Sequence, residues 1–484
     1  MNSLNANIWS ESYDLSVPLQ IPLANGQSLI CEEVVRAMPG RRYVCRGSYD
    51  GKSIFVKLFS FSRKAQREYQ RERQGIFDLQ EAGIPCPEII YIETSTTLAT
   101  QIIVYTELLE AESAKQRWGN GNEAARQTLL MQLVELLSRH HTAGLRQTDC
   151  HLLNFIFSDG ILYTLDAADI TKSSSSLSRK DSMDSLADML GLFEMKYDSI
   201  LPSLYKHYWL CRDSKTDDNE LERLAEKVIG LRQYKLRKYL EKIYRSCSEF
   251  IAEKNYKKFS VYRRNAKNPE LERLVKDPDS GQRTMLKDGN TCTVSLIDTS
   301  QQKLVCKRYN IKSAWHGILR AFRVSRASRS WRNAYRLEKY CIATPKPLAL
   351  VEQRFGPIRR KAWLFMPYID GISAHDFFHD DSRADQWQNA ASQFVELFCK
   401  MVQARLSHGD MKATNFIFSD GALFVIDLDS MRQHNNDASF AGAFSIDMQR
   451  FMRNWSDLPD LATLFREQLS TTVVAEYLPT AIKG

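Results

Sequence analysis

The sequence lacks the features of disulfide-rich, secreted and membrane-spanning proteins. Its 10 cysteines form no Cys-x-x-Cys pair, and several stand inside apolar runs such as 304–306. We therefore expect reduced, mostly buried cysteines, without a disulfide framework or a zinc site. No window reaches eighteen apolar residues, and residues 1–10 show no positive segment followed by an apolar one. These absences favour a cytosolic protein.

Extreme composition is absent as well. The 484 residues are 43% hydrophobic, 11% aromatic and 26% charged, which is ordinary for folded proteins. A chain of this length is too long for one ordinary domain and suits two or three. We therefore expect a globular protein with substantial cores rather than a disordered one.

Positive charge is concentrated in two stretches. Residues 231–270 contain twelve Lys or Arg against four Glu, and residues 303–337 contain ten Lys or Arg and no acid. Such stretches favour anionic partners, namely phosphorylated sugars, anionic lipid headgroups or nucleic acid. Each stretch taken alone is equally consistent with a solvated helix face.

A heptapeptide, Asn-Phe-Ile-Phe-Ser-Asp-Gly, occurs twice, at 154–160 and at 415–421. An aspartate precedes each copy and another follows it, so that the repeated pattern is Asp-x4-Asn-x11-Asp. The pattern comprises Asp149, Asn154 and Asp166 in the first copy, and Asp410, Asn415 and Asp427 in the second. This spacing is typical of phosphotransferases, which need a base for the acceptor hydroxyl and an amide and a carboxylate for Mg²⁺. The duplication predicts two domains.

The heptapeptide also predicts a β-hairpin. Two short runs of β-branched and aromatic residues, 416–418 and 423–426, flank Ser-Asp-Gly, a turn tripeptide whose glycine can adopt positive φ. Such a hairpin places the asparagine and the second aspartate at its two open ends. Hard oxygen ligands for Mg²⁺ then lie beside each other.

A lysine stands within a predicted strand in each half, Lys57 in 53–58 and Lys307 in 304–309. A lysine on an edge strand that reaches water is the structural alternative to a phosphate-binding lysine. The predicted helix 62–82 carries Glu68 and Glu72 on one face, and we favour Glu72 as the partner of Lys57, the alternative being a solvent-exposed helix face. Alignment of the prolines that follow this helix places Arg332 at the position of Glu72. In the second half the glutamate is therefore missing or supplied by another residue such as Glu338.

The catalytic-loop sequences of the two halves differ at several positions, and three of these differences bear on the chemistry. Gln147, Thr148 and His151 in the first half replace His408, Gly409 and Lys412 in the second. A histidine carries weaker charge than a lysine at pH 7, so it is less able to stabilise a transferring phosphoryl group. We therefore expect the second half to be the main catalyst.

The predicted domain organisation follows from the repeat and from the turn-rich segment between its copies. We expect an N-terminal arm at 1–30, a first domain at 31–267 with a basic, helical C-terminal part, a linker at 268–284 and a second domain at 285–484. Strand-like and helical patterns alternate in both halves, so the predicted fold class is α+β.

The chain resembles the lipopolysaccharide kinase family of Gram-negative bacteria, whose members phosphorylate heptose or Kdo of the inner core. In the second half the resemblance rests on Lys-Arg-Tyr-Asn at 307–310, Ser-Arg-Ala at 325–327, Thr-Pro-x-Pro at 344–347, and His-Gly-Asp-x-Lys-x-x-Asn at 408–415 with Asp-x-Asp at 427–429. In the first half it rests on Gly-Ile-Pro-x-Pro at 83–87 and Asp-Cys-His at 149–151. A departure is the single glycine, Gly289, where protein kinases have three.

The resemblance implies two tandem protein-kinase-like bilobal domains, each with a small β-rich N-lobe and a mainly helical C-lobe. It also implies ATP and Mg²⁺ as cofactors and the core oligosaccharide on lipid A as the acceptor. The protein would then act at the cytoplasmic face of the inner membrane, bound peripherally to its anionic surface, with no nucleic acid as partner.

Residue roles follow from the matching positions. Asp410 and Asp149 would accept the proton of the sugar hydroxyl, and Lys412 would stabilise charge on the γ-phosphoryl group. The ATP phosphates would be held by Lys307, and by Lys57 with Glu72. The expected Mg²⁺ ligands are Asn415 and Asp427 in the second half and Asn154 and Asp166 in the first.

Two other classes of function remain open. A small-molecule phosphotransferase of the aminoglycoside or choline kinase type shares the Asp-x4-Asn spacing, but it is expected to have an acidic pocket for a cationic substrate, which the basic stretches disfavour. The other possibility is a scaffold for core assembly in which one or both halves are pseudokinases.

Overall fold

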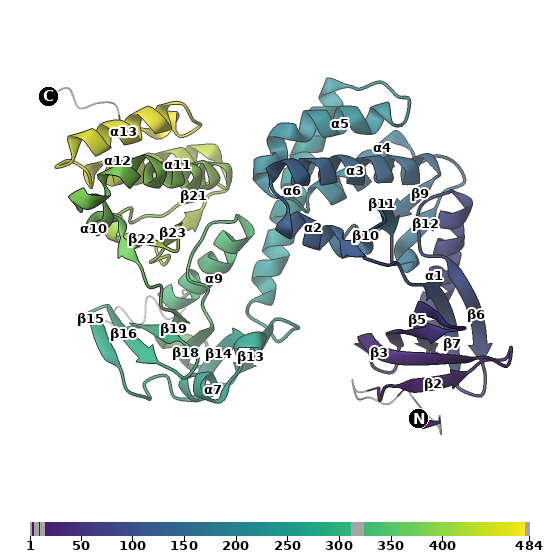
Figure 1. The fold of residues 1–484 in the computed structure, drawn as a ribbon. Coiled ribbons are helices and arrows are strands. Elements are labelled where there is room, and N and C mark those ends of the chain that lie inside the picture. The colour runs from purple at the N-terminus through teal and green to yellow at the C-terminus, as the bar shows by residue number, and fades with distance from the viewer. Residues whose placement is uncertain (1, 4–8, 10–14, 311–323, 480–484) are drawn as a thin grey trace. The chain divides into compact units, whose positions relative to one another are not determined.

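The computed structural model describes residues 2–3, 9, 15–310 and 324–479. The chain divides into two compact units, unit 1 and unit 2 (Figure 1). Unit 1 comprises Met1–Phe193 and Tyr197–Arg232, and unit 2 comprises Glu194–Lys196 and Gln233–Gly484. Each unit combines a strand-rich part with a helix-rich part, so the mixed fold class expected from the sequence is confirmed.

The strand-rich part of unit 1 is a seven-stranded sheet with the order β1-β2-β3-β4-β5-β7-β6. Neighbouring strands are antiparallel except for β1 and β2. The strands are β1 (Asn2–Ser3), β2 (Leu19–Pro22), β3 (Ser28–Met38), β4 (Arg42–Tyr49), β5 (Lys52–Ser60), β6 (Ile89–Ser95) and β7 (Thr100–Thr106). The segment 1–30, expected to be an N-terminal arm, therefore contributes strands to this sheet.

Helix α1 (Arg63–Glu81) follows β5 and occupies the span expected for the first long helix. Its buried residues include Glu68 and Glu72. At Gly75 the helix comes so close to the turn after Asp166 that a Cβ on residue 75 would lie 2.0 Å from the Ala167 oxygen. Glycine at this position therefore lets α1 pack directly against the segment that carries Asp166.

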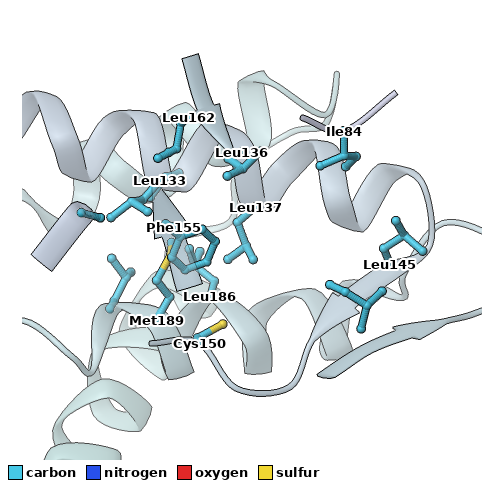
Figure 2. Close-up of a cluster of buried hydrophobic side chains, with 14 of the residues drawn as sticks. Ile84, Leu133, Leu136, Leu137, Leu145, Cys150, Phe155, Leu162, Leu186 and Met189 are labelled. Carbon is cyan, nitrogen blue, oxygen red and sulfur yellow. The ribbon is translucent and has the colours of Figure 1, made fainter. Parts of the chain in front are cut away.

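The helix-rich part of unit 1 surrounds the first copy of the heptapeptide. Its helices are α2 (Ala114–Asn120), α3 (Glu123–Thr142), α4 (Arg179–Leu190), α5 (Leu201–Leu210) and the first part of α6 (Asp218–Lys242), which continues into unit 2 after Arg232. Its strands are β8 (Glu112–Ser113), β9 (Leu145–Gln147), β10 (Phe155–Ser158), β11 (Ile161–Thr164) and β12 (Ile170–Lys172). Phe155, the first phenylalanine of the heptapeptide, lies among Leu133 and Leu137 of α3 and Leu186 and Met189 of α4 (Figure 2). The apolar heptapeptide residues thus anchor the hairpin in the core of unit 1.

Unit 2 contains a second seven-stranded sheet, with the order β13-β14-β18-β19-β17-β16-β15. All neighbouring strands are antiparallel. The strands are β13 (Phe250–Lys254), β14 (Lys258–Arg263), β15 (Thr284–Gly289), β16 (Cys292–Asp298), β17 (Lys303–Tyr309), β18 (Ala349–Phe355) and β19 (Ile358–Pro367).

The boundary between the units lies at Arg232 and Gln233, N-terminal to the expected linker at 268–284. Within that expected linker the chain forms helix α7 (Pro269–Lys276) and then begins β15. The helical pattern expected as far as residue 253 ends with α6, because β13 and β14 pair into the sheet of unit 2 through β18. That pairing joins segments far apart in the chain, and local composition does not reveal it.

The helix-rich part of unit 2 encloses the second heptapeptide. Its helices are α9 (Arg326–Lys339), α10 (Ala374–Phe378), α11 (Trp387–Gln403), α12 (Asp437–Arg453) and α13 (Pro459–Ser470), and its short strands are β20 (Ile372–Ser373), β21 (Leu406–Ser407), β22 (Phe416–Ser419), β23 (Ala422–Val425) and β24 (Arg432–Gln433). Phe416 packs edge-on against Phe394 of α11, which also contacts Phe451 of α12. Among the described helices, none combines the length and apolar composition that crossing a bilayer requires.

Candidate functional site

The repeated heptapeptide forms the predicted hairpin in both units. In unit 2 strands β22 and β23 pair from Phe416 with Val425 to Ser419 with Ala422, and both turn residues, Asp420 and Gly421, have positive φ. The Ile426 N–H donates to the Asn415 oxygen at 2.9 Å, which places Asn415 and Asp427 at the same end of the hairpin. The corresponding bond in unit 1, from Leu165 N–H to the Asn154 oxygen, measures 2.7 Å.

In unit 2 the strand lysine reaches the hairpin carboxylate. Lys307 on β17 donates from Nζ to Asp427 Oδ1 at 2.9 Å. Burial alone would raise the pKa of the Asp427 carboxyl, but the ammonium group of Lys307, with smaller contributions from His408 and Arg326, brings this pKa below its usual value. Asp427 is therefore ionised at neutral pH and only 35% exposed, with φ of 59°.

The side chain of Asp410 lies between two cations and an amide. Its Oδ1 is 3.1 Å from Arg450 Nη1 of α12, and its Oδ2 is 3.3 Å from Lys412 Nζ. The Asn415 side chain donates from Nδ2 to the Asp410 backbone oxygen at 2.8 Å and to Oδ2 at 3.3 Å. The carboxylate is thus held in one orientation while its side chain stays 25% exposed, which suits a group that must meet an acceptor hydroxyl.

His408 is a brace for this loop. It is completely buried, and burial lowers its pKa, so the ring is neutral at pH 7. Its Nε2 donates to the Ile426 oxygen at 3.0 Å, and its Nδ1 accepts from the Asp410 N–H at 3.3 Å. With both ring nitrogens engaged, His408 ties the loop to the hairpin and is not available as an acid or base.

Asp447 of α12 is a second brace, which the sequence analysis misses. It accepts from the His408 N–H at 2.6 Å and from the Gly409 N–H at 2.9 Å. Burial raises its pKa to about 6, although these two hydrogen bonds oppose the shift. The available signal was an aspartate on the apolar stripe of α12, among Phe440, Phe444 and Phe451.

Helix α9 holds the segment after Asp427 through a base rather than an acid. Arg326 contacts Asp429 Oδ2 from Nε at 2.8 Å and from Nη2 at 2.6 Å. The buried Asn333 donates from Nδ2 to the Leu428 oxygen at 2.8 Å and to the Met431 oxygen at 2.9 Å. Asp429, the second aspartate of the Asp-x-Asp motif, is thus engaged by Arg326.

No glutamate in the described part of α9 contacts Lys307. Glu338, suggested as a substitute partner, instead pairs with Lys346 and accepts a hydrogen bond from the Tyr239 hydroxyl at 3.4 Å. Arg332, at the position of Glu72, is exposed. The suggestion of Glu338 is therefore wrong, because this side chain is engaged elsewhere.

Unit 1 contains the lysine–glutamate pair favoured from the sequence. Lys57 Nζ lies 2.6 Å from Glu72 Oε1 and 3.5 Å from Asp166 Oδ1. The Tyr105 hydroxyl also donates to Glu72 Oε1, at 2.8 Å, and the Ala168 N–H donates to Oε2 at 3.0 Å. Glu72 is 1% exposed, so it links the strand lysine, the sheet and the turn after Asp166 from a buried position.

The catalytic-loop region of unit 1 is less firmly braced. Asn154 donates from Nδ2 to the Asp149 oxygen at 2.9 Å, as Asn415 does in unit 2, but the Asp149 side chain is exposed. The Thr148 N–H and hydroxyl both donate to the Asp169 oxygen at 2.9 Å. Gln147 replaces the histidine brace and makes a weak 3.4 Å bond to the Asp149 oxygen.

The oxygen donors present in unit 2 fit a hard divalent cation. Asn415 uses its nitrogen on Asp410, so its Oδ1 is left as an acceptor among the described residues, and Asp427 supplies an ionised carboxylate at the same end of the hairpin. The described residues contain no group of three His, Cys, Asp or Glu side chains arranged to hold a metal. An amide and one carboxylate suit Mg²⁺ whose coordination is completed by phosphate oxygens and water.

Comparison with known proteins finds a family match within the second half of the chain. Residues 281–461 match the Lipopolysaccharide kinase (Kdo/WaaP) family. This segment contains Lys307, Asp410, Asn415 and Asp427. The curated proteins include no significant match.

Three solved structures match part of the chain at low TM-scores. A structure of WaaP in complex with acyl carrier protein is 22% identical and covers 40% of this chain and 88% of that one, with a TM-score of 0.30. The PknI kinase domain of Mycobacterium tuberculosis is 11% identical, with coverage of 44% and 99% and a TM-score of 0.30. The bifunctional kinase-methyltransferase WbdD is 14% identical, with coverage of 44% and 49% and a TM-score of 0.31. Residues 281–461 of this chain are thus similar to the Lipopolysaccharide kinase (Kdo/WaaP) family, over less than half of the chain.

Proposed function

We propose that the protein is an ATP-dependent sugar kinase that phosphorylates heptose or Kdo of the lipopolysaccharide inner core, mainly through unit 2. The observation that carries this proposal is the constellation around Asp410. Its carboxylate is held beside Lys412 and Arg450, on a loop whose Asn415 shares a hairpin end with the Lys307–Asp427 pair. All these residues lie in the segment 281–461 that matches the kinase family.

The roles of the residues follow from their contacts. Asp410 orients the sugar hydroxyl and takes its proton at the carboxylate. Lys307 holds the phosphates of ATP when Mg²⁺ engages Asp427, and Asn415 is the second protein ligand of that ion. Lys412, whose ammonium lies 3.3 Å from Asp410 Oδ2, provides positive charge next to the attacking hydroxyl and the γ-phosphoryl group.

We further propose that units 1 and 2 are tandem protein-kinase-like domains, each with a β-rich and a helical lobe. Unit 1 would use Lys57 with Glu72 for ATP phosphates, Asn154 and Asp166 for Mg²⁺ and Asp149 as the base. Its more weakly braced loop, and His151 in place of Lys412, favour a slower kinase or a substrate-holding partner. If unit 1 has no kinase activity at all, the protein is a partly inactive scaffold in which only unit 2 catalyses phosphoryl transfer.

A lipid-linked acceptor requires the enzyme to work at a membrane surface. We propose peripheral attachment to the cytoplasmic face of the inner membrane through exposed Lys and Arg side chains. Each of these contributes roughly 1 kcal/mol near an anionic surface, and salt screens the contribution. An enzyme of the aminoglycoside or choline kinase type would have no need for this attachment.

The direct test is phosphoryl transfer from ATP to core oligosaccharide by purified protein carrying Asp410→Ala in an Asp149→Ala background. We expect turnover to fall by about 10²-fold or more, with an unchanged melting temperature, because Asp410 is needed for orientation and proton transfer rather than for packing. Asp385→Ala, which removes another exposed carboxylate of unit 2, is the matched control and should leave turnover unchanged. Undiminished turnover by the Asp410 variant would contradict the assignment of Asp410 as the base.

Mass spectrometry of the core oligosaccharide from a strain lacking the protein identifies the acceptor. Loss of one phosphate from a heptose or from Kdo is the expected result, and the sugar that loses it is the substrate. An unchanged core would contradict the proposed acceptor while leaving the phosphotransferase chemistry intact.

A further inference from the structure

Two hairpin turns lie side by side at one end of the unit 2 sheet. The first joins β13 to β14 at 255–257, and the second joins β18 to β19 at 356–357. Because β14 pairs with β18 (Figure 1), the turns are hydrogen-bonded to each other: the Arg354 N–H donates to the Lys257 oxygen at 2.7 Å, and the Gly356 N–H to the Tyr256 oxygen at 2.9 Å. The two turns thus form one continuous tip.

Two aromatic side chains at this tip are exposed and contact each other. Tyr256 is 59% exposed and Phe355 is 57% exposed, and their rings meet edge to face with centroids 5.0 Å apart. Tyr256 also covers Gly356, where a Cβ would lie 3.2 Å from the ring. Asn255 fixes the first turn by accepting from the Lys257 and Lys258 N–H groups at 2.9 Å and 2.8 Å. The aromatic pair is therefore ordered by its surroundings although both rings face solvent.

Four exposed cations lie in the first turn and in the strands that lead to the two turns. Lys254, Lys257, Arg360 and Lys361 are exposed, and none has a carboxylate partner among the described residues. We call Lys254, Tyr256, Lys257, Phe355, Arg360 and Lys361 the tip patch. The neighbouring basic residues are already engaged: Lys258 donates to backbone oxygens at the end of α7, and Arg354 and Arg359 contact the buried carboxylate of Glu352. The exposed acid nearest in sequence is Glu253.

Elsewhere in the two basic stretches, some of the positive charge is engaged by other protein groups. Arg326 engages Asp429, and Arg336 is buried and bonded to Asn333. Arg232 forms a two-oxygen contact with Asp198 at 2.7 Å and 2.8 Å. Residues 312, 320 and 323 lie outside the described residues. Sequence density of Lys and Arg therefore overstates the free charge, and the tip patch combines unpaired cations with exposed aromatic rings.

We propose that the tip patch docks unit 2 on an anionic lipid surface, with Tyr256 and Phe355 entering the headgroup region and the four cations contacting lipid phosphates. Aromatic side chains with an apolar body favour the interface between acyl chains and water, and cations beside them add attraction to anionic lipids. An acidic protein would use the cations, but it would not account for two large rings left exposed at a sheet tip. This inference rests on the proposed function insofar as the acceptor is lipid-linked.

The test uses the full-length protein and vesicles of phosphatidylethanolamine with phosphatidylglycerol, compared with vesicles of phosphatidylcholine alone. We expect wild-type protein to sediment with the anionic vesicles and to raise the surface pressure of an anionic monolayer. Tyr256→Ser/Phe355→Ser should weaken binding at least about tenfold and abolish the pressure rise. Lys257→Gln/Lys361→Gln should weaken binding roughly fivefold for each cation and reduce its salt dependence by about half, because two of the four cations remain.

The matched control is Leu210→Ser/Val473→Ser, which removes two other exposed apolar side chains, 69% and 55% exposed, and should bind as wild type does. If the aromatic variant binds anionic vesicles like wild type, or if wild type does not bind them at low salt, the proposal is wrong. Binding of an acidic protein through the cations alone, with no pressure rise, would overturn it too. Phosphorylation of lipid-free core oligosaccharide is unaffected by docking, so failure of the proposed function and failure of docking are read from separate assays.

Discussion

The two units use the same hairpin but secure the strand lysine in opposite ways. In unit 1 an acid on the long helix, Glu72, holds Lys57 and also accepts from the backbone of Ala168. In unit 2 residue 429, the counterpart of Ala168, is an aspartate, and a base on the helix, Arg326, holds it. The helix therefore contributes the acidic partner of the helix–loop contact in unit 1 and the basic partner in unit 2. Lys307 pairs with Asp427 instead of with a helix glutamate.

The catalytic loops differ in the other direction. In unit 2 two buried groups, His408 and Asp447, fix the loop backbone beside Asp410. In unit 1 the corresponding backbone is held mainly by the exposed Thr148 through the Asp169 oxygen. Unit 1 therefore has the better-secured lysine and unit 2 the better-secured base. The comparison teaches that the two requirements of phosphoryl transfer, nucleotide placement and acceptor placement, can vary independently in duplicated folds.

The largest expected effect comes from removing the carboxylate proposed to bind Mg²⁺ in each unit, in one full-length background. Asp427→Ala should reduce phosphoryl transfer to core acceptor about 10²- to 10³-fold, because it removes a charged ligand at the reacting phosphate. Asp166→Ala should reduce phosphoryl transfer by less than about threefold, since unit 1 has His151 where unit 2 has Lys412 next to its base. Initial rates at saturating ATP and Mg²⁺ measure the difference.

Both variants remove an aspartate with positive φ, at 59° in Asp427 and 56° in Asp166, so any backbone effect is matched. Loss of activity in Asp166→Ala with tolerance of Asp427→Ala would mean that the roles of the two units are reversed. Equal losses would mean that the units act together on one acceptor.

Substitution of Asp447 tests whether the hydrogen bonds that fix the loop beside Asp410 account for the difference in activity expected between the units. Asp447→Ala leaves the buried N–H of His408 and the N–H of Gly409 without their acceptor, at a cost of about 1–3 kcal/mol each. We expect the free energy of unfolding of unit 2 to fall by about 2–4 kcal/mol, and kcat to fall while KM for ATP is retained. Asp447→Asn keeps an oxygen acceptor and should lie between wild type and the alanine variant. A rise in KM for ATP as large as the fall in kcat would show that Asp447 does not act through the position of the loop.

Features encoded by neighbouring residues could be predicted from the sequence. The hairpin follows from β-branched and aromatic runs on either side of a turn tripeptide, and its register brings Asn415 and Asp427 to one end. The pairing of Lys57 with Glu72 followed from helix periodicity, because residues 68 and 72 share a buried face. These features depend on local backbone geometry, which sequence spacing records.

Features that depend on distant segments could not be predicted. The Arg326–Asp429 contact spans 103 residues of chain, and a helix position counted from Glu72 leads instead to the exposed Arg332. Strands β13 and β14 join the sheet of unit 2 through β18, whereas the sequence pattern predicted a helical C-terminal part of the first domain there. Unit boundaries and second partners of catalytic groups are set by tertiary packing, which overrides local propensity.

Acidification should distinguish the units. Burial lowers the pKa of His140 to about 3 and that of His141 well below its usual value, so both are neutral when unit 1 is folded. Their unfolded forms bind protons below a pKa of about 6.5, so the stability they contribute is present above that pH and is lost as pH falls. The free energy of unfolding of unit 1 should therefore fall on acidification, and His140 alone contributes a slope of about 1 kcal/mol per pH unit between pH 6 and pH 4.

In unit 2 the two principal buried groups oppose each other. His408, with its lowered pKa, loses stability on acidification, whereas Asp447, with its pKa raised to about 6, gains as it takes up its proton. Hydrogen exchange at pH 7, 6 and 5, normalised to the unfolded chain, should therefore show α3 losing protection before α12. Protection lost first from α12 would contradict this assignment of the buried groups.

The smallest expected effect concerns the acid on the helix of unit 1. In a Lys307→Ala background, which limits nucleotide binding to unit 1, Glu72→Gln should weaken ATP binding only about fivefold, because Lys57 retains Asp166 at 3.5 Å as a second partner. Glu68→Gln is the matched control, since Glu68 lies one turn earlier on the same buried face but pairs with Arg41 and Arg42 instead of Lys57. Isothermal titration with ATP and Mg²⁺ separates the two. An equal loss of ATP affinity in both variants would assign the effect to the helix as a whole. No loss in Glu72→Gln would show that an acid at this helix position is not needed for nucleotide binding, so its absence from unit 2 would not weaken ATP binding there.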